Sequence, residues 1–139
     1  MQGSTARTVA LLAAAGIVIG AIGPWQTTFL VDIAGTKGDG RVTLLLGLVA
    51  GILVLLREPG SRWLLLAVVL GVACTIVGVS DLVTVSNSTE EIYGREVDLI
   101  SPGWGLWLTA VASAVFTVSA YMFKTEAPHL QNAPPDQPA

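Results

Sequence analysis

Long apolar runs alternate with short polar connections along this chain of 139 residues. Runs without Lys, Arg, Glu or His lie at roughly Val9–Gly23, Val42–Leu56, Trp63–Val79 and Trp104–Phe123. The hydrocarbon core of a bilayer is about 30 Å thick, and about 20 helical residues cross it. The pattern therefore predicts an all-α membrane protein, a four-transmembrane-helix bundle within a domain at 1–124. We expect its spans at about 8–24, 41–57, 62–81 and 103–123.

The two long connections contain segments rich in β-branched and aromatic residues, which favour strands. In the first connection, residues 26–33 predict a strand followed by a turn over 35–40; the alternative is a first helix that runs on to Leu30. In the second connection, residues 82–85 and 96–100 are strand-like. We expect both connections to form a small extracytoplasmic β-element above the bilayer, where water can solvate the strand edges.

Positive charge predicts the orientation in the membrane, because cytoplasmic loops carry an excess of Lys and Arg. The shortest connection holds Arg57 and Arg62 within six residues, and Arg7 and Lys124 flank the outer spans on the same side. We therefore expect a multi-pass protein of the cell (plasma) membrane with both termini cytoplasmic. The other side carries Lys37, Arg41 and Arg95.

The sequence also supports separate predictions for the first apolar run and for the C-terminal tail. The first apolar run also resembles a signal peptide, but Pro24 after the small-residue box and the three later spans favour an uncleaved helix. The tail over 125–139 holds four of the seven prolines and few apolar residues, which predicts a disordered cytoplasmic segment.

Composition excludes several classes of function. Charged residues make up only 12% of the chain and the net charge is −3, so no basic surface is available for nucleic acid. Cys74 is the only cysteine and His129 the only histidine, which argues against a disulfide framework, a zinc site or a catalytic triad. The segment Gly38-Asp39-Gly40 lacks the alternating oxygen ligands of a calcium loop. We expect no enzymatic activity, no cofactor and no metal.

Two sets of residues are predicted to have structural roles: one packs the helices together, and the other anchors the bundle at the membrane interfaces. Small residues spaced four apart let helix backbones approach closely, and tryptophans favour the headgroup level. The predicted helix-packing residues are Gly16, Gly20, Gly47, Gly51, Gly71 and Gly78. The predicted interface anchors are Trp25, Trp63, Trp104 and Trp107.

Asp81 is the candidate polar site, because an acid at membrane depth is costly and marks function by default. The alternative is a carboxylate at the outer interface that pairs with Arg41 or Arg95.

Three short motifs carry a resemblance that covers about residues 8–123. They are Gly23-Pro24-Trp25, the segment Gly38 to Thr43, and Asp81 to Ser86 together with Gly103-Trp104-Gly105-Leu106-Trp107. In these motifs the chain resembles small four-span integral membrane proteins of actinobacteria and their phages. The resemblance implies four helices and an outer loop region, and it implies no particular activity.

These observations predict a non-enzymatic integral membrane protein that acts as an accessory, scaffold or partner-binding subunit. A phage-encoded form would act in exclusion or in modification of the host membrane. The expected partners are the lipid bilayer and a protein, or a second copy, bound through helix seams or outer loops. The alternative is an oligomeric channel or small transporter with Asp81 near the pore mouth.

Overall fold

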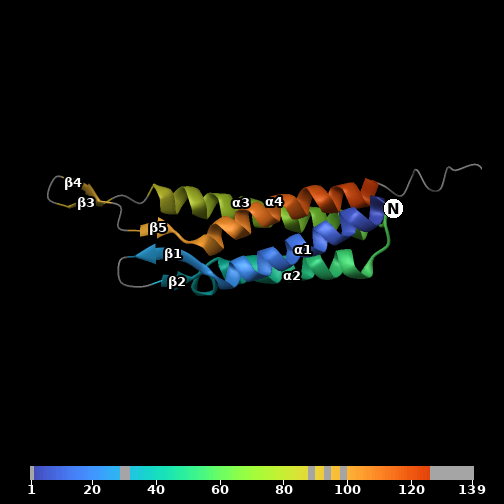
Figure 1. The fold of residues 1–139 in the computed structure, drawn as a ribbon, viewed down its shortest axis with the longest axis horizontal. Helices are drawn as coiled ribbons and strands as arrows, with labels where there is room; N and C mark the ends of the chain where they lie inside the picture. Colours follow the sequence, from blue (N-terminus) through green and yellow to red (C-terminus); the bar gives the residue numbers. More distant parts are fainter. Residues whose placement is uncertain (1, 29–31, 88–89, 93–94, 98–99, 126–139) are drawn as a thin grey trace, which may run out of the picture.

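The computed structural model describes residues 2–28, 32–87, 90–92, 95–97 and 100–125. Within these residues the chain forms a bundle of four helices packed side by side, and each helix contacts two neighbours in the order α1, α2, α3, α4 and back to α1 (Figure 1). The most extensive contact joins α1 to α4. The helices are α1 (Gln2–Ile22), α2 (Gly40–Leu56), α3 (Trp63–Ser86) and α4 (Trp104–Thr125).

The bundle has an apolar exterior and an interior of small residues. Three of its helices, α1, α3 and α4, are long and apolar enough to cross a membrane, whereas α2 is a shorter apolar helix of 17 residues. Large aliphatic side chains on every helix lie exposed, among them Leu12, Leu45, Ile76 and Val118. Alanines and glycines fill most of the interior, with Ile17, Phe116 and Phe123 as its largest apolar side chains. This arrangement suits lipid rather than water as the surrounding solvent.

The six glycines predicted to mediate helix packing all lie where two helices meet. At Gly20 the approach is closest, because a Cβ there would lie 2.5 Å from Oγ1 and 2.8 Å from the backbone nitrogen of Thr109. Gly16 and Gly20 face α4, Gly47 and Gly51 face α1, and Gly71 and Gly78 face α4.

A small antiparallel sheet covers one end of the bundle, which we call the sheet end. Its strands are β2 (Asp32–Ala34), β1 (Pro24–Thr28) and β5 (Ile100–Pro102), in that order, and a short 3₁₀ helix, η1 (Gly35–Lys37), follows β2. Because β1 comes from the first long connection and β5 from the second, the expectation of a β-element built from both connections is confirmed. The strands β3 (Glu90–Ile92) and β4 (Arg95–Val97) form a separate antiparallel pair.

The opposite end, which we call the turn end, carries the connection over residues 57–62 and the start of α1 (Figure 1). The Arg7 guanidinium donates a hydrogen bond to the carbonyl of Leu55 near the end of α2. The Arg57 guanidinium lies 5.3 Å from the centroid of the Trp63 ring. These contacts gather basic side chains at the end where α1 begins and α4 ends.

Two sequence-based expectations about secondary structure are wrong in detail. Residues 82–85 are not a strand, because α3 continues through them to Ser86 and the buried Val85 side chain packs beside Trp25 and Leu106. The segment 26–33 is not one strand but parts of two, β1 and β2. The predicted tail at 126–139 lies outside the described residues.

Candidate functional site

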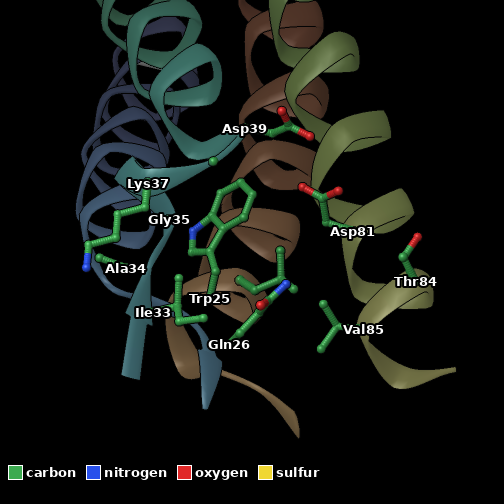
Figure 2. A pocket seen from close by; sticks show the side chains of 12 residues that line it. Trp25, Gln26, Ile33, Ala34, Gly35, Lys37, Asp39, Asp81, Thr84 and Val85 are labelled. Carbon is green, nitrogen blue, oxygen red and sulfur yellow. The ribbon is translucent and has the colours of Figure 1, made fainter. Parts of the chain in front are cut away.

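A cavity of about 320 Å³ opens at the sheet end, between the sheet and the last turns of α3 (Figure 2). Strands β1 and β2 provide Gln26, Ile33 and Ala34 on one side, and α3 provides residues on the other. The cavity exists because α3 extends past the level at which α2 begins. At that level the chain from β2 has already turned through η1 into α2. The sheet and α3 therefore stand beside each other without filling the space between them.

Trp25 forms the inner wall of this cavity. Its side chain is only 6% exposed, and its indole Nε1 donates a hydrogen bond of 3.0 Å to the carbonyl of Gly20. Its ring lies against Gly35, where no Cβ would fit. The prediction of four interface anchors does not hold for Trp25, because its ring is enclosed by protein. Trp63, Trp104 and Trp107 are about half exposed, as anchors would be.

Asp39 and Asp81 line the same cavity, one from the start of α2 and the other from α3 (Figure 2). Asp39 occupies the N-cap position of α2, yet its side chain makes no capping hydrogen bond. The carboxylate of Asp39 repels that of Asp81 electrostatically. An N-cap aspartate usually binds the free N–H groups of the helix start. Here the carboxylate is left available on the side of the cavity where Asp81 lies.

Of the two alternative partners considered for Asp81, Arg41 is bonded elsewhere in the structure. The Arg41 guanidinium donates to the carbonyl of Thr36 instead, because η1 brings that carbonyl close to the first turn of α2. The side chain of Arg95 lies outside the described residues. Lys37 also lines the cavity, but its side chain extends away from the two carboxylates (Figure 2). No ion pair to Asp39 or Asp81 is present within the part of the chain that the structure describes.

Helix length places the cavity about one hydrocarbon thickness from the start of α3. Asp81 follows Trp63 by 18 residues on α3, which corresponds to about 27 Å at 1.5 Å per residue. With Trp63 at one headgroup level, Asp81 lies close to the other, since the hydrocarbon core is about 30 Å thick. The exposed rings of Trp104 and Trp107 begin α4 at the same end of the bundle. Asp81 thus lies near the end of a helix of bilayer length rather than at its middle.

A second hollow lies on the outer surface of the bundle, between α1 and α2. It measures about 310 Å³ and is apolar, with Ala15, Val18, Leu48 and Gly51 among its lining residues. It is shallow because Gly47 and Gly51 let α2 approach α1 closely.

Sequence reasoning identified Asp81 but did not connect it with Asp39, Gln26 or Trp25. One signal was available, since an acid directly before the first helical residue marks a helix start. No local sequence pattern predicts that the Asp39 side chain leaves the capping position and lies toward the cavity. Asp32, at the same end of the bundle, is exposed on β2 and is not among the residues that line the cavity.

Comparison of the chain with protein-family models, with curated proteins and with solved structures gave no match.

Proposed function

We propose that the protein crosses the cell membrane four times, with both termini in the cytoplasm. The support for a crossing by the shorter α2 is its position, because it runs between α1 and α3 from the sheet end to the turn end. Its outer face is as apolar as theirs, with exposed Leu45, Leu48 and Ile52. The basic residues at the turn end support a cytoplasmic location for that end.

We further propose that the protein is a non-enzymatic, partner-binding subunit of a membrane assembly. The observation that carries this proposal is the pairing of β1 with β5, which joins two separate connections into one platform on the bundle. Short connections would be sufficient for a bundle whose only role is to anchor itself in the membrane. Loops positioned by a rigid scaffold are the usual location of binding surfaces.

Charge indicates the chemistry of the partner. The two long connections contain many more acids than bases, with Lys37 and Arg95 as their basic residues. A basic segment of a protein at the outer membrane face matches this surface, because complementary charge speeds association and excludes wrong partners. The acids of these connections are Asp32, Asp39, Glu90, Glu91, Glu96 and Asp98.

Affinity purification in mild detergent tests this function. We expect a specific protein to copurify in near-stoichiometric amount with the wild type, and about tenfold less with a variant in which Glu90, Glu91, Glu96 and Asp98 become their amides. Glu58→Gln is the control, because it removes an exposed acid at the turn end. Equal recovery with all three proteins, or no protein enriched by the wild type, contradicts the proposal.

The alternative is an oligomeric channel or small transporter, and the position of Asp81 in the cavity favours it. Against a pore through one copy, the buried polar side chains of the described residues are hydroxyls only. Thr43 and Thr109 donate back to carbonyls four residues earlier, which leaves no polar path. A pore would have to form between copies. Ion flux into liposomes that is lost in Asp81→Asn would support this alternative.

A further inference from the structure

From the cavity at the sheet end, we infer a binding site for a primary ammonium group. This inference is independent of the proposed protein partner, because it concerns the space between the sheet and α3 rather than the charged connections. The cavity is the observation that points to a ligand. Its volume of about 320 Å³ lies within the range of small-molecule sites, and its lining combines apolar walls with a few convergent polar groups.

The polar groups define the charge of the ligand. The carboxylates of Asp39 and Asp81 face the same space and repel each other, and no described cation pairs with either. Asp39 forgoes the capping role that its position offers. A cation between the two carboxylates would replace this repulsion with two attractions. Of the common cations, a primary ammonium has three N–H donors and can serve both acids at once.

The apolar wall favours an organic ammonium over a metal ion. The cavity is lined by the Trp25 ring together with Ile33, Val85 and Leu106, and the only N–H of that ring is already bonded to Gly20, so this wall supplies no ligand atom. An apolar wall can pack against the methylene groups of an organic ammonium ion, which a metal ion lacks. The described residues contain no group of three or more metal-ligating side chains.

Depth in the membrane gives the source of such a ligand. With the bundle in the membrane as proposed above, the cavity lies at headgroup level. An ammonium group at Asp39 and Asp81 that belongs to a phospholipid headgroup could reach the cavity from that level. The ethanolamine headgroup of a phospholipid and free phosphoethanolamine share this chemistry.

Native mass spectrometry of the full chain in mild detergent tests the site with two lipids of equal acyl chains. We expect phosphatidylethanolamine to bind more tightly than phosphatidylglycerol. The preference should fall about tenfold in Asp39→Asn and in Asp81→Asn, since a charged hydrogen bond is lost. Asp32→Asn should keep the preference, because Asp32 carries the same charge at the same end outside the cavity.

Soluble O-phosphoethanolamine separates the two sources. If O-phosphoethanolamine competes with the lipid, the free zwitterion is sufficient for binding. If the lipid binds without competition, the site requires a phospholipid. Either result supports the ammonium site. Equal binding of the two lipids, or an unchanged preference in Asp39→Asn, overturns it. Saturation of the site by Ca²⁺ or Mg²⁺ without any effect of amines also overturns it.

Thermal unfolding with and without lipid provides a check that needs no substitution at Asp81. Asp39 is exposed at the start of α2, so Asp39→Asn is expected to fold normally. Removing the repulsion should raise the midpoint of unfolding relative to Asp32→Asn, while the stabilisation by phosphatidylethanolamine should shrink. A midpoint that falls, with stabilisation by the lipid retained, contradicts the inference.

Discussion

At the scale of single residues, close contacts between small side chains hold this bundle together. Without water inside a bilayer, helices gain little from burying apolar surface against each other, and packing decides their association. Gly20 shows the limit of this packing, because Thr109 and Gly105 of α4 lie directly against it. Gly51 is less constrained, since the atom nearest to an added Cβ would be Ala14 Cβ at 3.0 Å.

Gly20→Ala should therefore destabilise the protein by about 1–3 kcal/mol, as overpacking does in a dense core. The new Cβ would meet the Thr109 nitrogen at 2.8 Å and the Gly105 oxygen at 2.9 Å, and backbone atoms cannot move without separating α1 from α4. Gly51→Ala should destabilise less, because its added Cβ would meet one side-chain atom at 3.0 Å and no backbone atom. Thermal unfolding in mild detergent measures both, and equal midpoints for the two variants would show that the α1–α4 contact is looser than described.

At the scale of elements, apolar runs and glycine spacing were sufficient to predict the helices, because the need to satisfy every backbone group in lipid leaves few alternatives. The strands were harder. Residues 82–85 are rich in β-branched side chains, yet they remain helical, with Thr84 donating 2.8 Å back to the carbonyl of Ser80. Packing of Val85 beside Trp25 outweighs local propensity there. That contact joins residues 60 positions apart, which no local pattern reveals.

The pairing of β1 with β5 predicts a disulfide between Thr27→Cys and Ser101→Cys in a Cys74→Ala background. These residues are register partners, and their side-chain oxygens lie 2.9 Å apart. Opposite residues of an antiparallel pair have Cα atoms about 4.5–5.5 Å apart, within the range for a disulfide. The oxidised protein should migrate faster on a gel without reductant. Thr27→Cys with Ser61→Cys is the control, because Ser61 lies at the turn end, and a bond there would contradict the fold.

At the scale of the whole molecule, the sheet end and the turn end are predicted to face opposite sides of the membrane. Asn87→Cys and Glu58→Cys, each in a Cys74→Ala background, place one exposed thiol at each end. In intact cells an impermeant maleimide should label Asn87→Cys and reach Glu58→Cys only after lysis. The chain with Cys74 alone should stay unlabelled, because that thiol is buried. Labelling of both positions in intact cells would refute the crossing by α3, which is the helix between them.

The unequal lengths of neighbouring helices have a consequence for the surrounding lipid. Of two adjacent helices, α2 has 17 residues and α3 has 24, so the apolar surface of the bundle is shorter beside α2 than beside α3. Where α2 crosses the bilayer as proposed, lipids beside it must compress to match it, and each ångström of hydrophobic mismatch carries a modest energetic cost. The protein is thus expected to partition toward thinner membranes. In thick membranes we expect copies to associate through their α2 sides, so that they share one region of locally thinned bilayer.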